Sequence, residues 1–102
     1  MEHIFLDKDN FETVIKEKDK ILVDFWADWC GPCRMLGAVI NKFMEAHPDA
    51  CIGKFDIDED DTIPSSFGIM SSPTIILFEN GEIKARKTGA MSIEELEEFY
   101  NQ

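Results

Sequence analysis

A run of apolar residues over positions 21–27 leads directly into two cysteines, and this junction limits the possible folds more than any other feature. The run has the composition of a buried strand and is interrupted only by Asp24. Trp-Cys-Gly-Pro-Cys follows at 29–33, and apolar residues then recur at helical spacing between 35 and 44. Pro32 suits the first turn of a helix, where its missing N–H is not needed. We therefore predict that a buried strand passes into a helix at the cysteine pair.

The rest of the chain alternates between strand-like and helix-like segments. Asn80-Gly81 is a strong signal for a tight turn between two strands. Asp9 with Glu12, and Ser92 with Glu95, have the spacing of a capping box that opens a helix. Further strands are predicted at 4–6, 51–57, 74–78 and 82–87.

The order of these segments predicts the fold class. Strands that are joined through helices pair in parallel, whereas the hairpin at the end adds antiparallel strands. Residues 58–66 are acidic and interrupted by Pro64, which predicts a loop or a short helix. We expect a three-layer α/β fold, in which a central mixed sheet of about five strands is flanked by about four helices. With 102 residues, we expect a single domain over 1–102.

Composition and charge exclude several classes of function. The formal net charge is −11, which disfavours binding to nucleic acids and to anionic membrane surfaces. Charges throughout residues 1–10 exclude a signal peptide there, and no apolar run approaches the roughly 20 residues that span a bilayer. We expect a soluble, cytoplasmic monomer. Its acidic surface is either plain solvated surface or a match for partners with a basic docking face.

The spacing of Cys30 and Cys33 points to redox chemistry or to metal binding. The nucleophile in disulfide exchange is the thiolate, and a free cysteine with a pKa near ~8.5 is mostly protonated at neutral pH. Cys30 lies where the helix begins, so the unpaired N–H groups and the helix dipole favour its thiolate. Cys33 lies one turn further along the same face. This arrangement predicts that Cys30 attacks a substrate disulfide and that Cys33 resolves the mixed disulfide.

Asp24 is the candidate proton acceptor for Cys33. Apolar residues surround it on both sides, and burial raises the pKa of a carboxyl group. A raised pKa suits a base that works near neutral pH. The alternative is an ordinary solvated aspartate at a strand end. Lys54 lies inside the predicted strand 51–57, where it either tunes Asp24 or is an ordinary edge lysine.

Metal sites are the main rivals to redox chemistry. A structural zinc site needs four ligands, and only Cys51, His3 and His47 remain to complete one. Asp56, Asp58 and Asp60 have the spacing that opens a calcium-binding loop. However, Asp61 stands where that loop needs glycine, and Phe67 where it needs glutamate. We therefore expect no metal.

Residues 24–33 resemble the signature of the thioredoxin family nearly letter for letter. The resemblance extends over almost the whole chain. It includes Lys54 within 53–58, residues 67–69 leading to Pro73-Thr74, the turn at 80–82, and Gly89-Ala90. It implies a protein disulfide reductase with no cofactor beyond the Cys30–Cys33 disulfide. The implied partners are disulfide-containing proteins and a thioredoxin reductase that restores the dithiol.

The same resemblance implies further site residues. Pro73 should follow a cis peptide bond and lie against the cysteines, and Lys54 should lie near the buried acid. The substrate should bind as an added strand along the backbone before Pro73. The surface around that strand should comprise Trp29, Gly31, Pro32, Ser72 and Gly89.

The sequence departs from the family pattern at several positions. Ser72 stands before Pro73, where the family usually carries isoleucine or valine, and Met70-Ser71 is also unusual. Gly37-Ala38 replaces a common proline in the middle of the helix.

Two other functions compete with a reductase. One is an oxidant or isomerase of the same superfamily, and the other is a binding module that uses the fold and not the thiols.

The remaining singled-out residues have structural interpretations. Cys51 is expected to be a small buried apolar residue, with a regulatory thiol as the alternative. His3 and His47 are expected at the surface. Trp26 is expected to pack in the core, whereas Trp29 is expected to shield the cysteines. Met35, Phe43 and Met44 are expected to form a core stripe on the helix.

Overall fold

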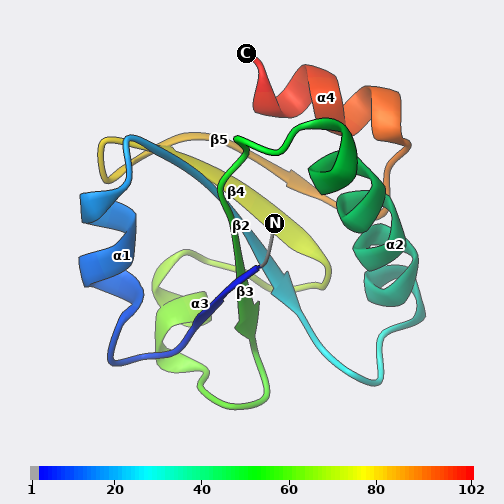
Figure 1. Cartoon of the computed structure of the whole chain (residues 1–102). Helices are drawn as coiled ribbons and strands as arrows, with labels where there is room; N and C mark the ends of the chain where they lie inside the picture. Colours follow the sequence, from blue (N-terminus) through cyan, green and yellow to red (C-terminus); the bar gives the residue numbers. More distant parts are fainter. Residues whose placement is uncertain (1–2) are drawn as a thin grey trace.

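The computed structural model describes residues 3–102, and within this range one five-stranded sheet forms the centre of the molecule (Figure 1). The strands lie in the order β1-β3-β2-β4-β5. The three strands β1, β3 and β2 are mutually parallel, and β4 and β5 are antiparallel to their neighbours. The strands are β1 (Ile4–Leu6), β2 (Lys20–Trp26), β3 (Ile52–Asp56), β4 (Thr74–Glu79) and β5 (Glu82–Thr88). The predicted mixed sheet is confirmed, with strand ends that differ by at most one residue.

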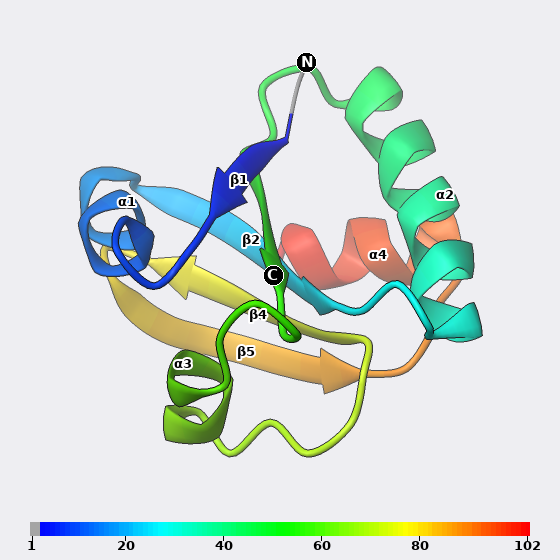
Figure 2. The ribbon, with the colours of Figure 1, turned by 90° about the horizontal axis from the view of Figure 1, so that it is seen from below.

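Four helices cover the two faces of the sheet in the described range. They are α1 (Phe11–Glu17), α2 (Gly31–Ala46), α3 (Thr62–Ser66) and α4 (Ile93–Tyr100). Figures 1 and 2 show α1 and α3 on one face and α2 and α4 on the other. The predicted three-layer α/β architecture is therefore confirmed.

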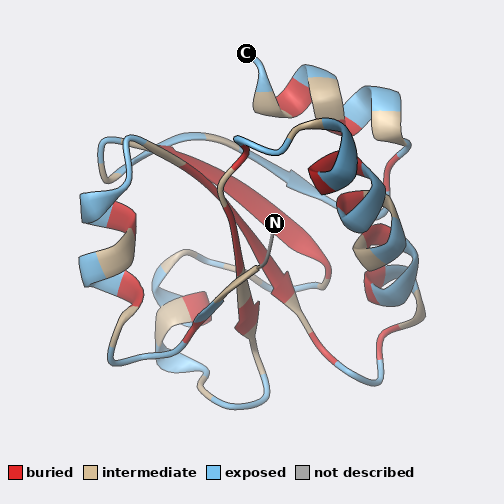
Figure 3. Cartoon of the chain, viewed as in Figure 1, coloured by how far each residue is buried: buried red, intermediate tan, exposed pale blue. Residues whose placement is uncertain are grey.

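Two hydrophobic clusters lie on opposite faces of the sheet because successive side chains of a strand point to opposite faces. Within β2, Leu22 packs with α2 and α4, whereas Ile21 and Val23 pack with α1. Figure 3 shows the central strands as buried and the outward faces of the helices as exposed. Strand β2 lies between β3 and β4, so every residue from Ile21 to Phe25 is fully buried.

The start of α1 differs from the prediction. Asn10, and not Asp9, precedes the first helical residue, and neither the Asn10 side chain nor Glu12 completes a capping box. Asp7 instead accepts hydrogen bonds from the N–H groups of Asp9 and Asn10, each at 2.8 Å. Glu12 pairs with Lys16 one turn along the helix at 2.9 Å. The predicted capping box between Ser92 and Glu95 is confirmed at α4.

Met35 does not belong to the core stripe of α2, so that prediction is wrong. Its side chain is 65% exposed, whereas Leu36, Ile40, Phe43 and Met44 are buried. At about 100° per residue, Met35 lies roughly 120° around the helix from the centre of this buried face, so it points away from the sheet. The helix itself runs without interruption through Gly37.

The structure also shows where residues 58–66, the two histidines and Cys51 lie. Residues 58–66 contain the short helix α3, in which Pro64 is the third residue and needs no intrahelical N–H partner. His47 is only partly exposed, because its ring packs against Phe43 and pairs with Glu97 at 2.8 Å. His3 and Cys51 are half-buried. Within residues 3–102, no helix has the length and apolar character that a membrane crossing requires.

Candidate active site

Cys30 and Cys33 form a disulfide at the junction between β2 and α2. Cys30 is the N-cap residue of α2, and its sulfur accepts a hydrogen bond from the N–H of Cys33 at 3.1 Å. Both side chains are only 4% exposed. The Cys33 N–H and the positive end of the helix dipole therefore lie beside the Cys30 sulfur, and they favour the thiolate when the pair is reduced.

The segment before β4 lies against this disulfide. The carbonyl oxygen of Ser72 is 3.5 Å from the Cys30 sulfur, and the Ser72–Pro73 peptide bond is cis, as the family resemblance implied. Gly89 donates its N–H to the carbonyl of Pro73 at 2.9 Å and has a φ of +97°, a conformation that favours glycine. The loop after β5 is thereby joined to the segment beside the cysteines.

Asp24 is a fully buried carboxyl group on β2. Neither of its oxygens has a hydrogen-bond partner among residues 3–102. Alternation along β2 places it on the same face as Leu22, which is the face that α2 covers. Burial raises the pKa of Asp24 from 3.8 to about 6, and the positive charge of Lys54 partly opposes this rise.

Lys54 is the neighbour of Asp24 on the adjacent parallel strand β3. Its ammonium group lies 4.8 Å from the centre of the Trp26 ring, and the residue is half-buried. Lys54 makes no ion pair with Asp24 within 4.0 Å among the described residues, so it acts on the carboxyl through its charge at longer range. Trp26 is accordingly half-buried and lies under a cation instead of lying fully in the core.

Trp29 forms an exposed rim beside the buried sulfurs. Its side chain is 68% exposed, and its indole N–H donates to the carboxylate of Asp58 at 2.9 Å. Gly31 and Ser72 are half-buried, and Pro32 is exposed. Sequence reasoning missed the pairing of Trp29 with Asp58. The available signal was that β3 runs parallel to β2, so the residues after both strands meet at one edge of the sheet.

Comparisons with known proteins agree with this geometry. The profile of the thioredoxin family matches residues 2–102. The chain belongs to the thioredoxin family. The thioredoxin of Acidithiobacillus ferridurans is 39% identical over 98 residues, which cover 94% of this chain and 91% of that protein. The thioredoxin of Alicyclobacillus acidocaldarius is 46% identical over 89 residues, which cover 86% and 85%.

A solved thioredoxin structure also matches this fold. A single-substitution mutant of the thioredoxin from Halobacterium salinarum superposes with a TM-score of 0.89 at 33% identity, covering 98% of this chain and 88% of that chain. The protein is therefore a thiol–disulfide oxidoreductase of the thioredoxin family, and the Cys30–Cys33 pair is its redox-active centre. In this family, disulfide-containing proteins and a reductase are the general partners.

The aspartates of the alternative calcium site make other contacts in this fold. Among residues 3–102, no three His, Cys, Asp or Glu side chains are grouped to hold a metal ion. Asp58 accepts a hydrogen bond from the indole N–H of Trp29, and Asp60 accepts hydrogen bonds from the Thr62 hydroxyl and from the N–H of Ile63. Asp56 accepts one from the N–H of Asp58. The three aspartates that have the calcium-loop spacing therefore serve other contacts.

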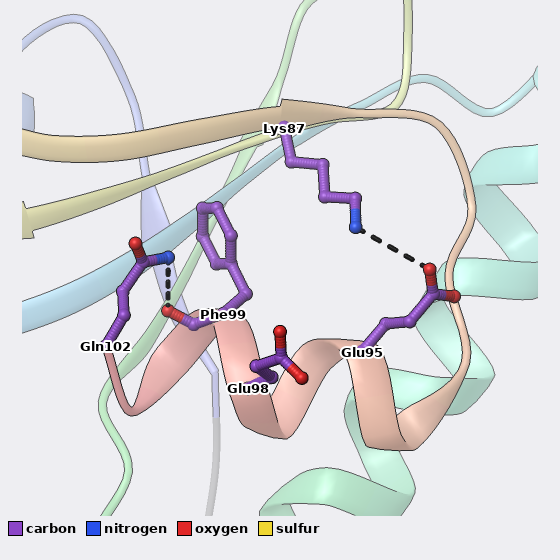
Figure 4. Close-up of a pocket in the computed structure, with 5 residues that line it drawn as sticks. All are labelled: Lys87, Glu95, Glu98, Phe99 and Gln102. Carbon is purple, nitrogen blue, oxygen red and sulfur yellow. Dashed lines mark hydrogen bonds and ion pairs between the residues drawn. The ribbon is translucent and has the colours of Figure 1, made fainter.

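A separate hollow lies between β5 and α4 and shares no residue with the thioredoxin centre (Figure 4). Lys87 and Glu95 approach each other across it at 3.6 Å, and the Gln102 amide donates to the carbonyl of Phe99 at 2.9 Å. These groups are paired with each other, and the hollow contains neither a cysteine nor a histidine.

Proposed function

We propose that Cys30 attacks substrate disulfides, that Cys33 resolves the mixed disulfide, and that Asp24 accepts the proton of Cys33. The position of Cys30 carries this proposal, because its sulfur sits at the N-cap of α2 and accepts the Cys33 N–H. A thiolate there is stabilised before the substrate arrives. Cys33 lies one turn inward on the buried face of α2, where a thiol needs a base before it reacts.

The cycle balances in electrons and protons. The Cys30 thiolate attacks one sulfur of the substrate disulfide, forms a mixed disulfide and releases the first substrate thiolate. Cys33 then gives its proton to the Asp24 carboxylate and attacks the Cys30 sulfur. This second exchange forms the Cys30–Cys33 disulfide and releases the second substrate thiolate. The substrate gains two electrons, and the protein loses them.

The surface around Cys30 is proposed to bind the substrate as an extended segment. Such a segment would lie along the backbone at Ser72 and Pro73, with Trp29, Gly31, Pro32 and Gly89 around it. The contact of 3.5 Å between the Ser72 carbonyl oxygen and the Cys30 sulfur supports this placement, because it puts a backbone acceptor beside the attacking atom. Lys54 is proposed to act indirectly, by limiting how far the pKa of Asp24 rises.

Three substitutions test these roles in stopped-flow reactions of the reduced protein with a disulfide-bonded protein substrate. Cys30→Ser should abolish reduction. Cys33→Ser should react once and accumulate a mixed disulfide that intact-mass measurement detects. Asp24→Asn should form the mixed disulfide at a normal rate and resolve it more slowly between pH 6 and 8. Unchanged resolution in Asp24→Asn would remove Asp24 from the mechanism, and a mixed disulfide trapped by Cys30→Ser would reverse the roles of the cysteines.

We also propose that the protein works as a cytoplasmic monomer with a single domain, and that a thioredoxin reductase restores its dithiol. The net charge of −11 supports the monomer, because like charges oppose self-association. Light scattering during size-exclusion chromatography tests the oligomeric state. Turnover of a disulfide substrate with a purified thioredoxin reductase tests the recycling step.

A further inference from the structure

A groove of about 250 Å³ runs from the cysteine site towards α3. It begins at Ser72, whose carbonyl oxygen is 3.5 Å from the Cys30 sulfur. A side chain that enters the groove therefore belongs to a residue close to the reacting cysteine of a bound substrate. The residues of the groove that matter here are Trp29, Ile57, Asp61, Ile69, Met70 and Ser72.

The walls of this groove are largely apolar and reach the solvent. Met70 is 97% exposed and Trp29 is 68% exposed, so two large apolar side chains face the solvent beside the buried sulfurs. An unbranched methionine adapts its shape to the side chain that it meets. The indole face of Trp29 offers a flat surface to an alkyl chain or to a cation. These walls fit a long, flexible side chain.

The charge in the groove is negative and unpaired. Asp61 precedes the first residue of α3, yet its carboxylate makes no capping hydrogen bond. Within residues 3–102 it has no side-chain hydrogen bond and no ion pair, whereas the neighbouring Asp58 binds the Trp29 indole. Neither lysine, arginine nor histidine lines the groove. A cation is therefore the complementary charge at this end.

We propose that the groove selects disulfide substrates that carry arginine or lysine within two residues of the reacting cysteine. The alkyl stem of that residue lies against Trp29 and Met70, and its charged end reaches the carboxylate of Asp61. Acidic residues at the same position are disfavoured by repulsion from Asp61. This inference rests on the proposed function, since it takes Cys30 as the attacking atom.

Short peptides test the inference directly. Each peptide has one cysteine joined to thionitrobenzoate, and arginine, leucine or glutamate is placed in turn at each of the two positions on either side. Attack of the Cys30 thiolate on the peptide sulfur releases the yellow thionitrobenzoate anion, so the rate is read by absorbance. At whichever position places its side chain in the groove, we expect the arginine peptide to react about fivefold faster than the glutamate peptide. A factor of this size corresponds to the usual strength of an interaction between exposed charges.

Two variants distinguish the effect of the groove on the peptide preference from the effect of the protein's overall negative charge. Asp61→Asn should remove most of the preference for arginine at that position, and asparagine suits the residue before a helix. Glu59→Gln removes one negative charge outside the groove and should keep the preference. Added salt should weaken the preference in the wild-type protein.

The outcomes also distinguish this inference from the proposed function. The inference would be overturned if, at every position, the ratio of the arginine rate to the glutamate rate were the same in wild type and Asp61→Asn. It would also be overturned if the leucine peptide reacted faster than the arginine peptide at every position. The proposed function is judged by the leucine peptides, which should react in wild type and Asp61→Asn alike and not in Cys30→Ser. Leucine peptides that react equally in Cys30→Ser would overturn the proposed function itself.

Discussion

The buried carboxyl of Asp24 should make the stability of this protein depend on pH in one definite direction. Its pKa rises from 3.8 to about 6 on folding, so the folded state holds a proton that the unfolded state has lost between these values. Stability is therefore greatest at low pH for this group and falls as the pH rises through about 6. Each pKa unit corresponds to about 1.4 kcal/mol, so the loss amounts to about 3 kcal/mol at neutral pH.

Replacing Asp24 with asparagine should remove this dependence. The asparagine amide would be buried without hydrogen-bond partners, as the Asp24 carboxyl is. This lowers the free energy of unfolding by an amount that does not vary with pH. The difference in unfolding free energy, Asp24→Asn minus wild type, should therefore become more favourable by about 2.4 kcal/mol between pH 4 and pH 8, because the unfolded carboxyl is already partly ionised at pH 4. Urea unfolding of the oxidised proteins, followed by tryptophan fluorescence at several pH values, measures this difference.

Other titrating groups cancel in this comparison because both proteins contain them. Leu22→Val provides a matched control, since Leu22 lies on the same strand and the same face and is also fully buried. Its effect on stability should be the same at pH 4 and pH 8. A difference for Asp24→Asn that stays within about 0.5 kcal/mol across this range would refute the reasoning, because it would mean that the folded carboxyl titrates near its ordinary pKa.

Three further predictions concern the helices and the cysteine pair. Gly37→Ala should stabilise the protein by about 0.5–1 kcal/mol, because a Cβ at Gly37 meets no atom within 4 Å. Thermal unfolding measures this gain, and a loss of stability would indicate unrecognised crowding at the site. Ser92→Ala should destabilise the protein by about 1 kcal/mol in urea unfolding through loss of the capping box, whereas the Ser92→Asp variant should retain most of the stability. The Cys30–Cys33 pair, equilibrated in graded dithiol buffers, should have a reduction potential of roughly −270 mV. A value near about −180 mV would instead indicate an oxidant or isomerase.

Much of the fold and the redox centre could be predicted because the signals are local. The apolar run before Cys30 and the helical spacing after it lie within one short stretch, and so does the turn at Asn80-Gly81. The end of each element depends on finer differences. Asp9 and Asn10 are equally good residues to precede a helix, and the contacts of Asp7 decide between them.

Contacts between distant segments could not be predicted in the same way. Met35 has the spacing of a core residue, but the rotation of α2 against the sheet turns it outward. The hydrogen bond from Trp29 to Asp58 and the groove at Asp61 depend on where α3 lies beside the cysteines. Only the packed fold determines that position, because no periodic pattern in the sequence records it.

The central position of β2 also determines when the redox centre comes into existence during synthesis. A ribosome makes β2 and both cysteines before β3 and β4, which are the neighbours of β2 in the sheet. Until β4 has been added, the nascent chain lacks one of the two strands that flank Asp24 in the sheet. Contacts between such distant segments form only after their loops close. The newly made thiols therefore acquire their tuned surroundings only after both strands that flank β2 have been synthesised.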